Sequence, residues 1–232
     1  MIRELIDSYL AKEQADRANQ ERSGKWSPSM FGRCYRAQYW NRANEPQSNP
    51  PEERNLRVFA VGKIFHTWVQ GFIKGGEIEK RIETDDVLGF ADIVLENEVI
   101  DIKSQHSYAF HYQKENNYNI VEDKKSHVLQ VAWYAIQLNK EYIRLAYFSK
   151  DDLCINEYYI KLTDEIRIMV REELLHLNSF WLSGTLPPAE PRAYGLDKKT
   201  GCSNECSRYC NFRDTCKAKE EAGGRQWNIS RI

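Results

Sequence analysis

The sequence lacks a long hydrophobic run, and it has no excess of charge of either sign. Its 232 residues carry a formal net charge of −1, which excludes a uniformly basic coat for nucleic acid but not a local basic groove. No stretch approaches the ~18 uncharged apolar residues that a membrane-spanning helix needs. The opening MIRELIDSYLAKEQ has charges where a secretory signal is apolar. We therefore expect a cytoplasmic protein (host cytoplasm if it is viral) with no membrane partner.

The composition is that of a folded protein. Hydrophobic residues make up 41% of the chain and aromatic residues 12%, which excludes wholesale disorder. The length suits one domain with appendages, or two small domains. Six cysteines are present. Because intracellular thiols stay reduced, clustered cysteines predict metal ligands rather than disulfides.

The hydrophobic period changes along the chain from helical to alternating and back. Helices are expected over residues 2–20, 28–42, 54–72, 125–138 and 163–184, and strands over residues 77–83, 87–95, 98–104, 142–149 and 154–162. Residues 43–53 form a loop by their Pro, Asn and Ser content. This order predicts a mixed α/β protein.

Two carboxylates and an amine are expected on one face of a hairpin in the stretch GFADIVLENEVIDIKS. If residues 96–97 form its turn, Asp92 falls opposite Asp101 with Cβ atoms ~4.5–5.5 Å apart, and Lys103 points to the same face. Opposed carboxylates repel each other, and a magnesium or manganese ion would relieve the repulsion. The alternative is a solvent-exposed face on which Lys103 is only a salt-bridge partner.

Two helical motifs flank this hairpin. Gly62 and His66 are four residues apart and share a helical face, so that the imidazole can reach a neighbouring strand and favour manganese over magnesium. Otherwise His66 is a hydrogen-bonded core residue. Gln130 and Tyr134 also share a face. Both can hydrogen-bond a phosphate, and the Tyr134 ring can stack on a base, or it simply completes the core.

The cysteines fall into two kinds. The segment GCSNECSRYCNFRDTC interleaves four of them with polar residues, which leaves no apolar face to bury. Such spacing predicts zinc or an iron–sulfur cluster, and zinc held by these four alone is one interpretation. Cys154 begins a predicted strand among apolar neighbours, and we expect it in the core.

Together these motifs resemble the PD-(D/E)XK nuclease superfamily. The Gly-x-x-Asp of residues 89–92, followed by the Asp-x-Lys of residues 101–103, is similar to its core motif. The Gly-x-x-x-His of residues 62–66 and the Gln-x-x-x-Tyr of residues 130–134 resemble the RecB-like branch. Cys34 and the late cysteines are similar to the four-cysteine iron–sulfur version found in AddB-type and CRISPR-associated adaptation exonucleases.

The resemblance implies a restriction-endonuclease-like core of helix, three strands, helix and strand. N-terminal helices and a C-terminal cysteine-rich iron–sulfur segment would flank that core. Residues 1–53 would be the N-terminal helices, residues 54–184 the nuclease core, and residues 185–232 the cysteine segment. The last would pack back on the N-terminal helices in one compact unit.

The resemblance also implies a metal-dependent deoxyribonuclease, an exonuclease on single-stranded or free-ended DNA. Mg²⁺ or Mn²⁺ would be held by His66, Asp92, Asp101 and the main-chain carbonyl of Ile102. Lys103, Gln130 and Tyr134 would complete the catalytic site. A [4Fe–4S] cluster would be bound by Cys34, Cys206, Cys210 and Cys216, with Cys202 as a substitute for Cys206 and zinc as the rival metal. Arg33, Arg36 and Lys125 are candidate contacts to the DNA backbone.

The implied setting is CRISPR adaptation, or phage or bacterial recombination, with the partner proteins of those processes. The oligomeric state is left open. A different class of function is a non-catalytic DNA-binding module stapled by zinc or iron–sulfur, in which the acidic pair no longer holds a metal. The presence of Asp92, Asp101 and Lys103 together argues against that class.

Overall fold

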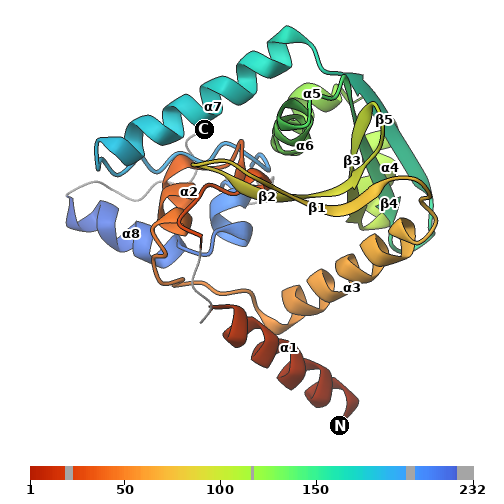
Figure 1. Cartoon of the computed structure of the whole chain (residues 1–232). Coiled ribbons are helices and arrows are strands. Elements are labelled where there is room, and N and C mark those ends of the chain that lie inside the picture. Colours follow the sequence, from red (N-terminus) through yellow and green to blue (C-terminus); the bar gives the residue numbers. More distant parts are fainter. Residues whose placement is uncertain (19–22, 116–117, 197–201, 224–232) are drawn as a thin grey trace.

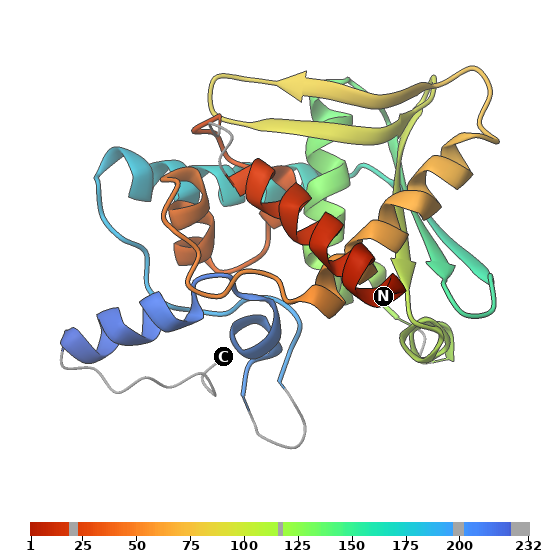
Figure 2. The same cartoon turned by 90° about the horizontal axis from the view of Figure 1, so that it is seen from below.

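The computed structural model describes residues 1–18, 23–115, 118–196 and 202–223. A five-stranded sheet carries helix α6 (Lys125–Gln137) on one face and helix α3 (Glu53–Gln70) on the other (Figure 1, Figure 2). The architecture is mixed α/β, as predicted. Within the described ranges, every helix is too short or too polar to cross a membrane.

The sheet contains the five predicted strands in sequence order. They are β1 (Glu77–Glu83), β2 (Leu88–Val94), β3 (Glu98–Gln105), β4 (Tyr142–Ser149) and β5 (Ile155–Lys161). Strands β3 and β4 are parallel, and the other neighbouring pairs are antiparallel. A parallel pair requires a long crossover, which here passes through α4 (Ser107–Glu115), α5 (Ile120–Asp123) and α6. Helices α4 and α5 were not predicted, because their aromatic and polar residues show no regular apolar stripe.

The β2–β3 hairpin has the predicted register, with Ile93 opposite Ile100. The ladder stops at this pair, whereas β3 continues beside β4 to its end. Asp92 and Asp101 are the next residues in the same register. They therefore lie where β2 and β3 diverge, in a fork between α3 and α6.

The predicted helix over residues 28–42 is interrupted. One 3-10 turn covers Pro28–Met30, and helix α2 begins only at Tyr35 and ends at Arg42. Gly32 between them has φ +75°, and a Cβ atom there would lie 3.0 Å from the Ser126 Cα of α6. The positive φ and the close approach explain both the glycine and the break. Cys34 therefore precedes α2 rather than lying on it.

The core lies mainly between the sheet and helix α7 (Asp164–Leu182), with α6 in the middle. Thr163 caps α7 as predicted, its side chain accepting a hydrogen bond from the Ile166 amide at 3.4 Å. Helix α6 is covered almost all round. Its buried residues are Val128, Leu129, Val131, Ala132, Trp133, Tyr134 and Ala135. This burial fixes α6 rigidly beside the fork.

Cys154 is exposed and was wrongly predicted to lie in the core. It precedes β5 in the β4–β5 turn, where its amide donates a hydrogen bond to the Asp152 side chain at 3.2 Å. The apolar neighbours belong to an edge strand whose residues are only alternately covered. Apolar neighbours in the sequence therefore did not indicate burial of the Cys154 thiol.

The cysteine segment forms a π-helical turn at Glu205–Tyr209 and helix α8 at Arg213–Ala222. Neither was predicted, because the segment has no apolar period. It packs on α2, where the rings of Trp40 and Phe212 lie 5.6 Å apart. The Asn49 amide also donates to the main-chain carbonyl of residue 211 at 2.9 Å. Chain segments far apart in sequence are thus in direct contact.

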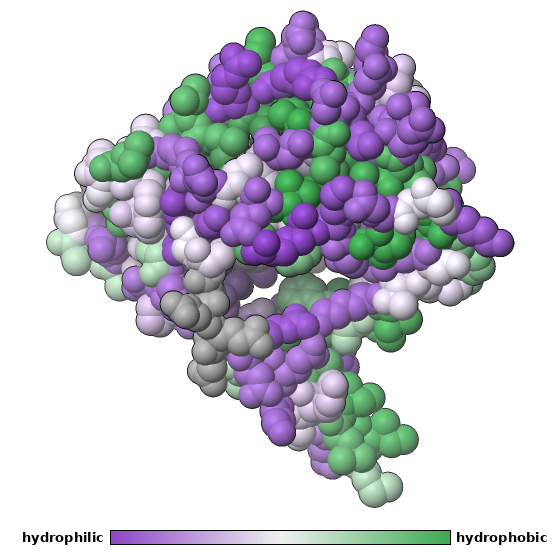
Figure 3. All heavy atoms as spheres, viewed as in Figure 1, coloured by the Kyte–Doolittle hydropathy of each residue, from purple (hydrophilic) through white to green (hydrophobic). Residues whose placement is uncertain are grey.

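Helix α1 (Ile2–Ala18) forms as predicted and is tied to α3 by ion pairs. Asp7 pairs with Arg57, and Glu13 pairs with Lys63 at 2.9 Å. The apolar residues Ile2, Leu5, Ile6 and Tyr9 are exposed. A hydrophobic patch is correspondingly visible at the free end of α1, at the bottom of Figure 3.

Candidate metal and nucleic-acid site

The fork between β2 and β3 brings together the acidic pair and the amine. Asp92 is 9% exposed and Asp101 2%. Asp92 Oδ2 accepts a hydrogen bond from the Ile102 amide at 2.6 Å, which ties the two strands together where their ladder has ended. Lys103 Nζ donates to Asp101 Oδ1 at 2.9 Å and to Gln130 Oε1 of α6 at 3.2 Å. The exposed-face alternative is thereby excluded for the two carboxylates.

His66 reaches this fork from α3. Its Nδ1 lies 3.5 Å from Asp92 Oδ1. Burial acts to lower the pKa of His66, but the hydrogen bond and negative charge of Asp92 outweigh burial and raise it. The imidazole therefore lies beside Asp92, where the resemblance of the Gly-x-x-x-His motif implies it.

Asp101 has the environment of a cation ligand. Burial raises its pKa to about 6 against the lowering effect of the Lys103 ammonium, and the charge of Asp92 raises it further. Its buried Oδ2 lies 2.8 Å from Lys103 Nζ, so that the ammonium is close to both carboxylate oxygens. A bound metal ion would add further positive charge and favour the ionised carboxylate. These oxygen and imidazole donors fit Mg²⁺ or Mn²⁺.

Glu79 of β1 is a further candidate ligand that the sequence analysis missed. Residues 78 and 80 pair with residues 93 and 91, so Glu79 faces Asp92 in the register. Ligand atoms of Glu79, His66 and Asp92 lie within 4.8 Å of one another. Gln70 Nε2 donates to Glu79 Oε1 at 2.8 Å and orients it. Applying the pairing argument to the β1–β2 hairpin would have found this residue.

Gln130 and Tyr134 have different surroundings. Gln130 holds Lys103, whereas Tyr134 is 3% exposed and packs on Gly89. Burial raises the pKa of the Tyr134 hydroxyl, against the lowering effect of the Phe90 main chain and the Gln130 side chain. The interpretation that the Tyr134 ring stacks on a base is therefore wrong, because the ring is buried. Its contact with Gly89 explains why the Gly-x-x-Asp strand and the Gln-x-x-x-Tyr helix occur together.

We expect Gly89→Ala to destabilise the protein by about 1–3 kcal/mol, as overpacking does in cores. The added Cβ would lie 2.6 Å from the Tyr134 hydroxyl and 2.9 Å from Pro28 Cγ. Denaturant unfolding would measure the loss. Gly62→Ala is the matched control, because its Cβ would meet only Ser104 Oγ at 3.6 Å. Equal stability of the two variants would contradict this packing.

Positive charge gathers beside the acidic pair. Burial and the cations Lys103, Lys124 and Arg33 hold the pKa of His127 well below its usual value. His127 Nδ1 lies 2.7 Å from the Tyr147 hydroxyl. These cations provide a local field suited to phosphate, within a chain whose net charge is close to zero.

As the pH is lowered below about 6.5, the free energy of unfolding should decrease, because His127 is kept neutral in the folded state. The unfolded chain then binds an extra proton, which lowers the free energy of unfolding by up to ~1.4 kcal/mol per pH unit. Unfolding of wild type and His127→Asn between about pH 5 and 7 would measure this. The variant should be less stable at neutral pH, having lost the bond to Tyr147, but with a flatter profile. Parallel profiles would contradict the assignment.

The three predicted DNA contacts have different environments. Arg33 Nε is buried without a hydrogen bond, and its guanidinium lies 5.3 Å from the centre of the Tyr194 ring. Lys125 is exposed at the start of α6. Arg36, contrary to expectation, is 3% exposed and donates to the Pro187 carbonyl at 2.7 Å. It also pairs with the Glu220 side chain of α8. Its guanidinium therefore joins α2 to the C-terminal segment and is unavailable to DNA.

The four cysteines that the resemblance implies as cluster ligands lie together, at a site separate from the fork. Cys34, Cys206, Cys210 and Cys216 line one small cavity, and Cys202 is not among its lining residues. In the described part of the chain, no three cysteine sulfurs lie within 4.8 Å of one another. Four thiolates around a single zinc at ~2.3 Å would be only about 3.8 Å apart.

Two of these four thiols accept hydrogen bonds, and all four cysteines are buried or half-buried. The Phe212 amide donates to Cys210 Sγ at 3.4 Å, and Arg36 donates to Cys216 Sγ at 3.4 Å. Burial raises the pKa of Cys34 and of Cys206 to about 12. Protonated thiols in a buried cluster must exchange their protons for metal.

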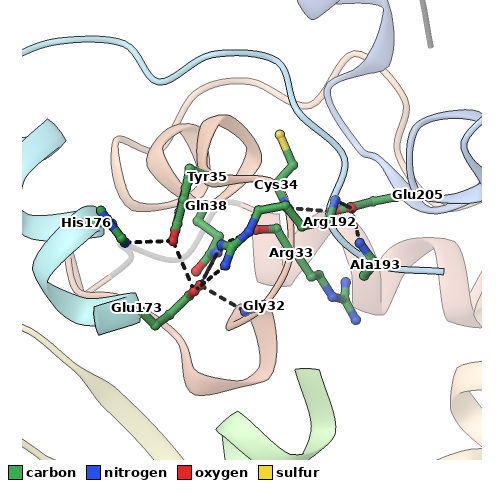
Figure 4. A network of polar contacts seen from close by, with 10 residues as sticks. All are labelled: Gly32, Arg33, Cys34, Tyr35, Gln38, Glu173, His176, Arg192, Ala193 and Glu205. Atoms are coloured by element: carbon green, nitrogen blue, oxygen red, sulfur yellow. Dashed lines mark hydrogen bonds and ion pairs between the residues drawn. The ribbon is translucent and has the colours of Figure 1, made fainter. Parts of the chain in front are cut away.

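A buried polar network holds the loop that carries Cys34 (Figure 4). The carboxylate of Glu173 on α7 accepts hydrogen bonds from the Gly32 amide at 2.9 Å and from Arg192 at 2.8 Å. The Glu205 carboxylate accepts from the Cys34 and Arg192 amides, each at 2.6 Å. The Cys34 side chain points away from this network, and its backbone is fixed.

Comparison with known proteins concerns the fold. No protein-family model and no curated protein sequence matches the chain. The solved structure of SSO0001 matches with a TM-score of 0.55 and 21% identity, covering 94% of this chain and 98% of that one. An alkaline exonuclease (LHK-Exo) from Laribacter hongkongensis has a TM-score of 0.47, 15% identity and coverage of 70% and 93%. A phage-related exonuclease from Haemophilus somnus 129PT has a TM-score of 0.43 and 14% identity, and the match covers 63% of this chain and 78% of that one.

The chain thus shares a mixed α/β fold with SSO0001 over almost its whole length. At these identities the likeness concerns the fold and not the chemistry. The residues with catalytic chemistry converge at the fork between β2 and β3.

Proposed function

We propose that this protein is a metal-dependent deoxyribonuclease, acting as an exonuclease on single-stranded or free-ended DNA. The observation that carries the proposal is the convergence of the buried carboxylates of Asp92 and Asp101 with Lys103 at the fork. Two buried carboxylates beside a single ammonium are costly unless a further cation joins them.

The proposed ligands of Mg²⁺ or Mn²⁺ are His66, Asp92, Asp101 and the carbonyl of Ile102, and we add Glu79. When bound, the ion supplies Lewis-acid polarisation of the phosphate and a lowered pKa for water. Lys103 is held between Asp101 and Gln130, which fixes its ammonium where it can orient a water and stabilise charge on a phosphate oxygen. Gln130 acts as a positioning residue for Lys103.

The remaining cations suit the DNA backbone. Arg33 and Lys125 are proposed to contact phosphates, which contributes affinity without sequence preference. The pKa of Lys124 is lowered by burial, so its charge is less freely available than that of Lys125.

We further propose a [4Fe–4S] cluster on Cys34, Cys206, Cys210 and Cys216. The shared cavity brings together the four thiols that the resemblance implies as cluster ligands, which supports this ligand set. Cys202 lies outside the cavity lining, which supports Cys206 as the ligand. The cluster would be structural, joining the loop before α2 to α8.

The biological setting proposed is CRISPR adaptation, or phage or bacterial recombination. This rests on the resemblance of the motifs. In each of these settings, DNA with free ends is the available substrate.

Degradation of end-labelled single-stranded DNA tests the activity. We expect products with Mn²⁺ or Mg²⁺ and none with EDTA, and the position of the retained label gives the polarity. Glu79→Gln should raise the Mn²⁺ concentration needed by about 10-fold, whereas Glu157→Gln, an exposed glutamate of β5, should not. No cleavage under any metal would reject the deoxyribonuclease.

A further inference from the structure

Helix α4 exposes two tyrosines one turn apart. Tyr108 is 76% exposed and Tyr112 43%. Their ring centres lie 6.4 Å apart, with the ring planes 25° from parallel. Tyr118, after α4, lies edge-on to Tyr112 with its ring centre 6.2 Å away. Large aromatic rings held in a row on a surface are typical of recognition sites rather than of a solvated helix face.

The two rings suit planar ligands. Tyr108 is 76% exposed, so a base can stack on the face of its ring, and Tyr112 offers a second ring 25° from parallel with the first. Each base has a π-face, so such a surface tolerates any sequence.

Tyr108 closely follows the proposed active site in the sequence. It lies five positions after Lys103, with four residues between them, so the two Cα atoms are at most ~18 Å apart. Gln105, at the end of β3, donates to Gln113 of α4 at 3.3 Å, which fixes the helix to the strand that carries Asp101 and Lys103. A short oligonucleotide can therefore span both places.

The charges around α4 are compatible with the binding of a polyanion such as DNA. The Asp151 carboxylate accepts a hydrogen bond from the Ser107 amide at 2.7 Å, and Asp152 lies 2.7 Å from His111 Nε2. Both acids are thus engaged with α4 itself. Lys124 Nζ lies 5.5 Å from the centre of the Tyr118 ring, which adds a cation at the far end of the row.

We propose that Tyr108 and Tyr112 form a stacking platform for unpaired bases of a single-stranded DNA substrate. This inference rests on the proposed deoxyribonuclease function and specifies how its substrate is held. Bases within a duplex are already stacked on both faces, so the platform discriminates in favour of single strands.

Fluorescence anisotropy with EDTA present tests binding without cleavage. The probe is a fluorescein-labelled oligothymidylate of about 15 nucleotides, close to the upper site size of one such surface. Tyr108→Ala and Tyr112→Ala should each weaken binding by about 10-fold, whereas Tyr108→Phe and Tyr112→Phe should bind like the wild type. Tyr9→Ala is the matched control, because Tyr9 is 70% exposed on helix α1. An abasic probe of equal length should bind the wild type as weakly as the normal probe binds the alanine variants.

Two results would overturn the platform. Wild-type affinity in both alanine variants would assign the tyrosines to another partner, such as a protein. Equal affinity for the normal and abasic probes would leave only backbone binding. Failure of the nuclease proposal is separable, since a protein that cleaves nothing but binds in a tyrosine-dependent way retains the platform.

Discussion

Lys103→Ala is expected to reduce DNA hydrolysis by at least about 10³-fold in protein that still folds, with a loss of stability because Asp101 stays buried without its ammonium partner. The Lys103 ammonium is the group that lies between Asp101 and Gln130, and its side chain is 23% exposed. Its removal takes away the positive charge that faces the reacting phosphate. End-labelled single-stranded DNA with saturating Mn²⁺ measures kcat, and denaturant unfolding monitors the fold.

The control for this variant is Lys161→Ala. Lys161 is an exposed lysine at the end of edge strand β5, so its loss changes the net charge equally without touching the fork. Equal degradation of DNA by wild type and Lys103→Ala would exclude the proposed active site. A loss of the same size in Lys161→Ala would point to a general effect of charge on binding.

Cys34→Ser is expected to remove the bound iron and to lower Tm by more than about 10 °C in anaerobically purified protein. The free energy of binding a structural metal is also free energy of folding, and a change of a few kcal/mol moves Tm of a chain this size by several degrees. Cys34 closes the cavity from the loop before α2, whereas its three partners come from the C-terminal segment. Loss of the Cys34 thiol therefore detaches the loop before α2 from the cluster and from the C-terminal segment. Iron and sulfide content, visible absorption and thermal unfolding measure these effects.

Cys154→Ser is the matched control, because Cys154 is exposed in the β4–β5 turn. It should keep wild-type iron content and Tm. Brown wild-type protein with iron in proportion to chains supports the cluster. A colourless protein with one zinc per chain would reject the cluster in favour of the rival metal.

Local periodicity accounts for the parts of the site that were predicted. The period of two along β3 places Asp101 and Lys103 on one face, and the hairpin turn places Asp92 opposite Asp101. The helical period aligns Gln130 with Tyr134. These relations span few residues, so backbone geometry alone carries them.

The errors arise where a side chain's surroundings come from distant segments. Arg36 was predicted to contact DNA, yet Pro187 and Glu220, both far away in sequence, enclose it. For Tyr134 the sequence left open whether its ring stacks on a base or completes the core, and contact with Gly89 of β2 decides for the core. Charge and aromaticity in a sequence do not say which face of a helix meets solvent.

The sequence by itself determined the five strands, the long helices, and the acidic pair with its lysine, because short-range spacing specifies them. Tertiary structure alone decided that α3 brings His66 to Asp92, that Glu79 joins them from β1, and that four distant thiols line one cavity. The physical reason is that these contacts depend on how whole elements pack, and packing is a property of volume and burial summed over the fold.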